Sequence, residues 1–540
     1  MFNTQLYRRG LLAVLLGFVA LPAWAQSFRV QCPNTTLLHP NPQTAEPPYY
    51  GHTNMNATAN GVPLTYVSNG GAIKCQQVSG GDGYMTEADG NQTYMFSFGP
   101  LSGLNSIQNG LPGTQFPAVF NAPYNAPKMN NGQPNPVYDS SKPLNLDGAI
   151  TDPGAIMDTG VLNGNIPAPL MAIDEDDEFF LTLTNVGMIM RPDLFEQHTI
   201  HFHGYPNASS YYDGVPDASA AVNIGGSFTY YYLAPDAGTY FWHCHITPPE
   251  HLQMGMVGQL FVRPRQNRAP SGRNLYATLQ VQQTDLRTRC NSTDILCSNP
   301  LPPVDTGAVQ PAGGAKYAYN DGDGSTRYDI DVPIQIHGFD PNFHFVGMTF
   351  NPEGFADMKD KYFLLNGRSY PDTVGVVGYA GGPTGAATET NPDGSTTRNP
   401  TATNDLTTKA SDGYSRPSQP LTTLVKLTQG QRALLRISDL DVSEYQTLAS
   451  LGIQMQVIGY NAKLLRDQAG NNLYYTTNSI TLGGGEALDV ILDSCQVRAA
   501  ANTCTTPVPK GTYFLYTPNL DHLSNDAENF GGLMAEVVVQ

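Results

Sequence analysis

Basic residues and long apolar segments are both scarce in this chain of 540 residues. Only 14% of its residues are charged, and 28 lysines and arginines face 46 aspartates and glutamates, which gives a formal net charge of −18. Nucleic acid is not an expected partner, because proteins that bind it present basic surfaces. The acidic balance suits either the attraction of cations or simple solubility.

The one long apolar run lies near the start of the chain. Arg8 and Arg9 precede an apolar segment over residues 10–21, and a small-residue exit follows at Ala23-Trp24-Ala25. This order is typical of a secretory signal peptide, which we assign to residues 1–25. No later stretch is apolar and long enough for a transmembrane helix, so we expect a soluble mature protein that is periplasmic or secreted.

Cysteine is scarce as well, and six of the seven cysteines fall into pairs along the chain. The expected disulfides are Cys32 with Cys75, Cys290 with Cys297, and Cys495 with Cys504. An oxidising compartment lets such bonds persist, although spacing alone does not fix their connectivity. The seventh cysteine, Cys244, stands apart in a segment rich in histidine.

Six of the eleven histidines lie between residues 198 and 251. A thiolate, two imidazoles and a weakly bound thioether form the donor set of a blue copper centre. That set is supplied by Cys244, His198, His251 and Met256. A structural zinc site is the alternative, since zinc also binds cysteine and histidine, but it would leave four imidazoles without a role.

The four remaining imidazoles indicate a second site. Positions two apart on a strand face the same side, which pairs His201 with His203 and His243 with His245. Cys244, between the second pair, then points to the opposite face of its strand. One strand is therefore expected to contact two metal sites, with a short covalent route from the sulfur to the flanking histidines.

These motifs resemble those of the multicopper oxidase family, which is built from cupredoxin domains. The family pattern H-x-x-H-x-H-G matches residues 198–204, and H-C-H followed by H-x-x-x-G-M matches residues 243–256. The resemblance implies blue-copper ligands His198, Cys244 and His251 with Met256 axial, a mononuclear-site ligand His201, and dinuclear-site ligands His203, His243 and His245. It extends to segments 163–167, 213–216 and 238–242 around the ligands.

An acidic residue and a pair of prolines lie close to the motifs. Asp213 stands where the family has an acidic residue near its cluster, so it is either a proton donor or, as part of Asp213-Gly214, a turn residue. Pro248 and Pro249 lengthen the family's usual spacing between Cys244 and His251 by two residues.

The fold is expected to be all-β. Short alternating runs such as 179–184 and 227–233, separated by turn residues, are typical of a sandwich. The resemblance implies tandem cupredoxin-like Greek-key β-sandwiches. We predict an irregular N-terminal extension at 26–150, a copper-binding domain at 151–270, a connector at 271–360, and a copper-free cupredoxin-like domain at 361–540 with a low-complexity insertion at about 373–420.

The second domain is an internal repeat that has lost the ligands. Residues 511–518 parallel residues 238–245, but Tyr516, Thr517 and Pro518 replace the H-C-H motif. In the family, the oxygen-reducing cluster needs eight histidines from two domains, and here one domain offers four. His337 and His344 either reach a neighbouring subunit's site or are ordinary loop or core residues.

Two main functions follow from this pattern. The first is a copper oxidase that takes single electrons from a phenol, metal ion or partner protein and reduces oxygen at a cluster completed across the interface of a homo-oligomer. The second is a blue-copper electron carrier or copper-binding protein without oxidase activity. A nitrite-reductase-like trimer fits less well because of His201 and His245, and a purely structural role leaves the intact ligand set without a purpose.

Overall fold

In the computed structural model, residues 30–540 are described, with the longer gaps at 52–57, 64–70, 128–133, 146–160, 281–299, 347–353, 375–387, 391–395, 399–406 and 410–414 and further gaps of one to three residues. The predicted signal peptide and the Cys290–Cys297 pair lie outside the described residues. Among the described helices, none is long and apolar enough to cross a membrane.

The first β-sandwich consists of two four-stranded sheets. One sheet has the order β4 (Gln92–Ser97), β3 (Ile73–Thr86), β6 (Glu178–Gly187) and β8 (Ser227–Leu233). The other has the order β5 (Met171–Asp174), β10 (Val257–Arg263), β9 (Gly238–His243) and β7 (His201–Phe202). Phe179, Leu181 and Leu183 alternate along β6 and are fully buried, because one face of each sheet packs on the shared core.

Two strands of this sandwich come from the segment that we expected to be an irregular extension. β3 pairs in parallel with β6 and antiparallel with β4. The sequence of β3 is rich in glutamine, glycine and serine, so its alternation of apolar and polar residues is weak. Its place in the fold is fixed instead by hydrogen bonding to β6.

The second β-sandwich is larger. One sheet has the order β14 (Tyr362–Leu365), β13 (Ile330–Phe339), β20 (Arg432–Asp439), β26 (Ala487–Asp493), β22 (Met455–Tyr460) and β23 (Lys463–Leu464), with β24 (Tyr475–Thr477) also on β22. The other has the order β19 (Val425–Leu427), β30 (Met534–Val539), β29 (Gly511–Tyr516), β21 (Gln446–Leu451) and β25 (Ser479–Leu482). The prediction of an all-β chain with tandem sandwiches is confirmed.

The remaining described strands are short, and the described α-helices have at most six residues. These strands are β1 (Thr58–Ala59), β2 (Val62–Pro63), β11 (Lys316–Tyr317), β12 (Arg327–Tyr328), β15 (Thr388–Thr390), β16 (Thr396–Arg398), β17 (Thr407–Lys409), β18 (Ser415–Pro417), β27 (Cys495–Arg498) and β28 (Cys504–Pro507). The α-helices are α2 (Leu104–Gln108), α3 (Pro117–Phe120), α5 (Pro248–Gln253), α6 (Leu275–Gln280) and α7 (Pro341–Val346), and 3-10 turns lie at 210–212, 265–268, 355–357, 372–374 and 521–523. Pro248 and Pro249 open α5, where proline is favoured because the first N–H groups of a helix have no internal acceptor.

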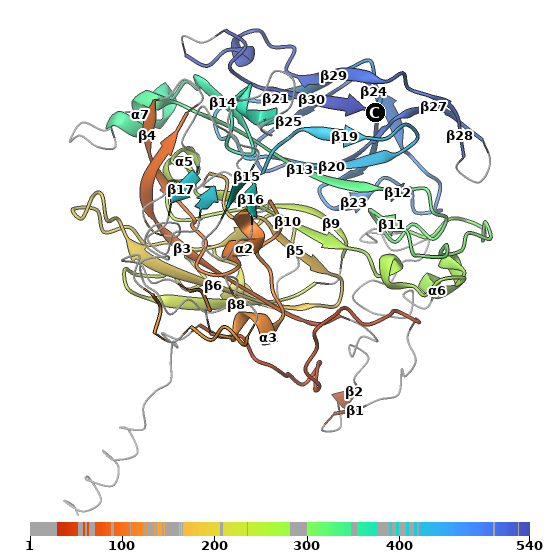
Figure 1. Ribbon diagram of the computed structural model, residues 1–540, viewed down its shortest axis with the longest axis horizontal. Coiled ribbons are helices and arrows are strands. Elements are labelled where there is room, and N and C mark those ends of the chain that lie inside the picture. The colour runs from red at the N-terminus through yellow and green to blue at the C-terminus, as the bar shows by residue number, and fades with distance from the viewer. Residues whose placement is uncertain are drawn as a thin grey trace, which may run out of the picture.

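The two sandwiches pack against each other through β9 and β10. Figure 1 shows β6 and β8 in one half of the molecule and β29 and β30 in the other, with β9 and β10 between them. Thr239 of β9 donates a hydrogen bond to Asp489 Oδ1 at 2.7 Å, and Gln259 of β10 donates one to Ser438 Oγ at 2.8 Å. The strand that ends at the H-C-H motif is thus also a strand of the domain interface.

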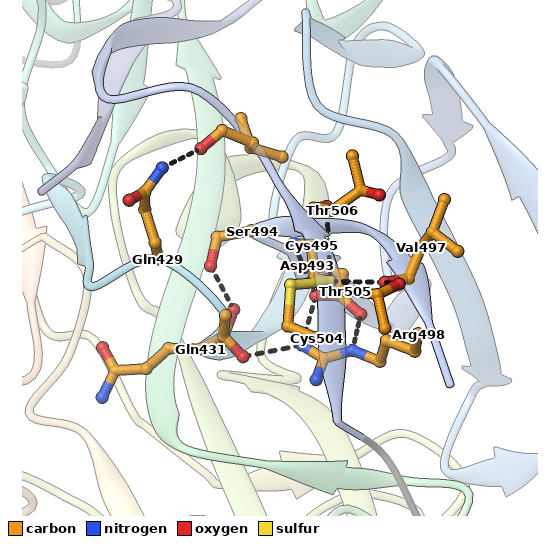
Figure 2. The surroundings of a disulfide bond; sticks show 12 residues. Gln429, Gln431, Asp493, Ser494, Cys495, Val497, Arg498, Cys504, Thr505 and Thr506 are labelled. Carbon is orange, nitrogen blue, oxygen red and sulfur yellow. Dashed lines mark hydrogen bonds and ion pairs between the residues drawn. A yellow bond between two sulfur atoms is a disulfide. The ribbon is translucent and has the colours of Figure 1, made fainter. Parts of the chain in front are cut away.

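Two of the predicted disulfides lie within the described residues, and both are present. Cys32–Cys75 ties the N-terminal segment to β3, and Cys495–Cys504 joins β27 to β28. Figure 2 shows the second bond with Arg498 directed at Asp493 beside it. Cys244 is a buried free thiol.

Candidate metal centres

The first candidate site lies where β9 ends and α5 begins. His198, Cys244, His251 and Met256 are each 0% exposed. The Cys244 Sγ atom is 3.9 Å from His198 Nδ1 and 3.2 Å from His251 Nδ1. The structure therefore brings two imidazole nitrogens and a thiol sulfur together in a water-free position, which fits a soft metal cation such as copper.

Backbone hydrogen bonds fix this geometry. The Cys244 N–H donates to the Met256 carbonyl at 3.1 Å, and the Met256 N–H donates to the His251 carbonyl at 2.8 Å. The Thr199 N–H points at the Cys244 sulfur at 3.4 Å. This contact helps to hold the sulfur in place beside the two imidazoles.

The two imidazoles differ in their electrostatic surroundings. Burial lowers the pKa of His198 well below its ordinary value. Burial acts in the same direction at His251, but the interactions with Cys244 and with the Glu196 carboxylate outweigh it and raise the pKa of His251 to about 10. The Glu196 Oε2 atom lies 3.4 Å from His251 Nε2. The position between Cys244 and His251 thus stabilises a positive charge.

The second candidate site is formed by the four remaining histidines of the first sandwich. Ligand atoms of His201, His203 and His243 all lie within 4.8 Å of one another. The ring of His245 is 5.0 Å from that of His201 and 5.4 Å from that of His243. The predicted same-face pairs therefore converge from β7 and from the end of β9.

The hydrogen bonds of these rings leave nitrogen lone pairs facing one another. His201 Nδ1 lies 2.7 Å from the Asp213 carbonyl oxygen, and His243 Nδ1 lies 2.7 Å from the Cys244 carbonyl oxygen. A carbonyl only accepts, so Nδ1 carries the proton in both rings and Nε2 keeps a lone pair. Backbone contacts of this type fix the tautomer of metal-binding histidines.

His203 also presents a nitrogen lone pair to the cluster. Its ring hydrogen-bonds the Gly485 backbone, and its Nε2 atom lies 3.0 Å from His243 Nε2. Burial lowers the pKa of His203 to about 4 and that of His243 well below its ordinary value, so both rings are neutral at pH 7. The two unprotonated Nε2 atoms of His203 and His243 repel each other at this distance unless a proton or a cation lies between them. A set of imidazole nitrogens of this kind fits copper.

Asp213 is placed at this second site by the turn that follows the 3-10 helix 210–212. Its carboxylate Oδ2 atom is 3.6 Å from His201 Nδ1, while its backbone carbonyl makes the shorter contact. Gly214 has φ +83°, and a Cβ there would lie 1.9 Å from the Ile200 carbonyl oxygen. Asp213 is thus both part of a tight turn and a carboxylate beside the cluster.

The second sandwich contributes no histidine to this cluster from its described residues. His337 contacts the Leu440 carbonyl, His344 bridges the carbonyls of Tyr94 and Gln253, and His522 lies between Gln446 and Glu444. All three are buried. His337 and His344 are therefore core residues of the domain interface, the second of the two alternatives stated for them.

Sequence reasoning missed several residues that shape these sites. A Cβ on Gly80 of β3 would lie 2.6 Å from the His198 ring, and a Cβ on Gly485 would lie 2.7 Å from the His203 ring. Glu196 and Thr199 flank His198 in the chain but carry no recognisable motif. Only the contacts across the fold identify these four residues.

Comparison with known proteins finds similarity to copper-containing oxidoreductases. Residues 149–267 match the family described as "Multicopper oxidase". The laccase abr2 of Aspergillus fumigatus is 34% identical over 109 residues, which are 20% of this chain and 17% of that protein. The copper-containing nitrite reductase of Rhizobium meliloti is 34% identical over 122 residues, which are 22% of this chain and 29% of that protein.

Among solved structures, the blue copper oxidase from Nitrosomonas europaea aligns with a TM-score of 0.45 and 17% identity over 86% of this chain and 85% of that chain. The matches to the first three curated relatives span only 17%, 16% and 24% of their lengths. The segment matched by the family contains every candidate metal ligand described above. The similarity to the multicopper oxidase family described by this match lies in residues 149–267.

Proposed function

We propose that this protein is a copper-dependent oxidoreductase that oxidises an external reductant and reduces oxygen to water. The observation that carries the proposal is the link between the two candidate sites at Cys244. Its sulfur lies 3.2 Å from His251 Nδ1 in the first site, and its carbonyl oxygen accepts from His243 Nδ1 in the second at 2.7 Å. One residue thus connects a site for single electrons to a cluster of imidazoles.

Copper held by a thiolate and two imidazoles supplies one-electron redox chemistry. In this proposal the blue-copper residues are His198, Cys244, His251 and Met256, and the cluster residues are His201, His203, His243 and His245. The chain itself excludes water from the first site, because its members are fully buried. It also holds the imidazoles in one tautomer, so that little rearrangement accompanies a change of charge.

We infer a role in proton supply for Asp213. Its Oδ2 atom lies 3.6 Å from the ring of His201, on the partly exposed side of the cluster. Reduction of oxygen to water consumes protons, and a carboxylate at this place is positioned to take up protons from solvent and pass them to the cluster. The backbone carbonyl of the same residue orients His201.

A second candidate function is that of a blue-copper electron carrier without oxidase activity. It is favoured by the second sandwich, whose described histidines all bond to carbonyl, amide or carboxylate groups away from the cluster. In the oxidase version, a neighbouring copy of the chain would supply the missing ligands. We therefore propose that the oxidase is a homo-oligomer. We also propose that it is periplasmic or secreted. Its reductant is a small molecule, a metal ion or a protein.

The test is copper content together with oxygen consumption. We expect copper-reconstituted protein to show a blue thiolate-to-copper absorption band and to consume oxygen with a phenolic reductant, and Cys244→Ser to lose both. About four coppers per chain would support a completed cluster, whereas one copper with the same band and no oxygen consumption would leave the electron carrier.

A further inference from the structure

A cavity of about 590 Å³ lies between the two sandwiches, beside the histidine cluster. Its wall on the first sandwich comes from α5 and β9 and includes Phe241, Pro249 and Leu252. Its wall on the second sandwich comes from the loops 441–445 and 483–486. A cavity of this size is within the range that holds a small organic molecule.

The two prolines that lengthen the copper-binding loop belong to this cavity. Pro248 and Pro249 both line it, at the start of the helix that carries His251. Leu252, the residue after His251, lines it too. The insertion therefore forms part of an apolar wall without disturbing the buried blue-copper residues.

The opposite wall is acidic. Asp441, Glu444 and Glu486 line it, and no lysine or arginine occurs among the described lining residues. Each carboxylate is held in place by a donor of its own domain. Glu444 Oε2 accepts from His522 Nε2 at 2.8 Å, and Glu486 Oε2 accepts from the Gly483 N–H at 2.7 Å. Three fixed carboxylates without a basic side chain among them attract a cation.

Aromatic groups stand at both ends of the cavity. Tyr445 is 75% exposed at the mouth and packs over Gly483, where a Cβ would lie 3.0 Å from its ring. Phe241 lies at the inner end, with its ring 4.7 Å from that of His203 and 5.2 Å from that of His243. A guest in the cavity would thus meet a cation–π partner at the entrance and rest against the histidine cluster inside.

We propose that this cavity binds small aromatic cations, such as protonated or alkylated aromatic amines. The apolar wall of α5 suits an aromatic ring, and the carboxylate wall suits a positive group on that ring. Their use as reductants rests on the proposed oxidoreductase function, whereas their binding does not. A bare metal ion could bind the carboxylates but would make no contact with the apolar wall.

The test measures binding of phenyltrimethylammonium to the full-length, copper-loaded protein by calorimetry. This probe is a permanent aromatic cation that is not readily oxidised, so binding is read without turnover. We expect saturable binding that weakens as salt is added, because the attraction is electrostatic. Benzyl alcohol and benzenesulfonate, which lack the positive charge, are expected to bind at least tenfold more weakly than the cation.

Two variants address the two walls. Glu444→Gln keeps an acceptor for His522 but removes a charge, and Tyr445→Ala removes the exposed ring; each is expected to weaken probe binding by about three- to fivefold. Asp467→Asn removes a charge from an exposed turn that does not line the cavity and is expected to leave binding unchanged. Thermal unfolding of each variant shows that it is folded.

Absence of probe binding, equal binding of benzyl alcohol, or binding that neither variant weakens would each overturn the proposal. Binding of manganese ions with no binding of the probe would assign the cavity to metal ions instead. Binding of the probe by a protein that consumes no oxygen would contradict the oxidase and leave this inference intact. Oxygen consumption with neutral phenols but no probe binding would support the oxidase and overturn this inference.

Discussion

At the scale of single residues, Gly80 has no side chain, and this makes room for the ring of His198. A Cβ there would lie 2.6 Å from His198 Cδ2 and 3.1 Å from Cγ. We expect Gly80→Ala to push the ring away from Cys244 and to destabilise the fold by about 1–3 kcal/mol, as overpacking does. The blue absorption band per bound copper should fall or shift, as measured by visible and paramagnetic resonance spectra.

Gly81→Ala is the matched control. A Cβ at this neighbouring position would lie 2.8 Å from the Val186 side chain and 3.2 Å from the Gly187 carbonyl oxygen, so it would also be crowded, but not against a candidate ligand. It should lower the unfolding temperature to a similar degree and leave the blue band unchanged. Equal spectra from the two variants would show that His198 adjusts without loss of its position.

Asp213 combines a backbone role with a side-chain role, and a conservative variant separates them. Asp213→Asn keeps the carbonyl that lies 2.7 Å from His201 Nδ1 and removes only the carboxylate charge. We expect copper content to stay constant while oxygen consumption at saturating reductant falls by about 100-fold, the usual range for loss of a proton-transferring group. Unchanged oxygen consumption across pH 5 to 8 would reduce Asp213 to a turn residue.

At the scale of elements, β9 contributes to the candidate metal sites and to the domain interface. All six of its residues are buried, from Gly238 to His243. Thr239 faces the second sandwich, where its hydroxyl donates to Asp489 Oδ1. Asp489 is 1% exposed and also accepts from the Tyr319 hydroxyl.

Thr239→Val keeps the shape of the side chain and removes this donor. We expect a loss of about 1–3 kcal/mol in the free energy of unfolding, because a buried carboxylate oxygen loses its hydrogen bond. Copper content should not change, since residue 239 does not touch either site. Denaturant unfolding with and without copper measures both effects, and a fall in copper content alone would contradict this division of roles within β9.

At the scale of the whole molecule, the two sandwiches meet at a buried polar network beside α5. Asp360 accepts a hydrogen bond from Gln253 of α5 at 3.0 Å. Burial and the neighbouring Asp441 carboxylate raise the pKa of Asp360 to about 10. Asp360 is therefore protonated in the folded protein at pH 7, while the same group in the unfolded chain ionises near pH 4.

This difference gives the pH dependence a definite sign. Between about pH 4 and pH 10 the folded state holds a proton that the unfolded state has released, so this group's contribution to stability falls as pH rises. We expect Asp360→Asn, which keeps the acceptor for Gln253, to flatten the decline in unfolding temperature between pH 5 and pH 9. Asp217→Asn, at an exposed position, should leave the slope as it is.

A slope that Asp360→Asn does not change would mean that this carboxyl group is ionised in the folded protein. Calorimetric scans at several pH values distinguish the two outcomes.

The sequence by itself determined the fold class and the donor groups that the two candidate sites contain. The H-x-H and H-C-H motifs are local, and the alternation of side chains along a strand places His243 and His245 on the face opposite Cys244 without any knowledge of the fold. The same period of two identified β6 and β8 as strands of a sandwich. Such information is carried by neighbours in the chain.

Only the tertiary structure decided what surrounds those residues. β3 has no clear alternation, yet it lies beside β6, and from it Gly80 makes room for His198. Gly485 of the second sandwich reaches His203, and the Pro248-Pro249 insertion faces an acidic wall more than a hundred residues away. These contacts depend on how distant segments pack, because packing is set by the sum of many weak interactions across the fold and leaves no local pattern.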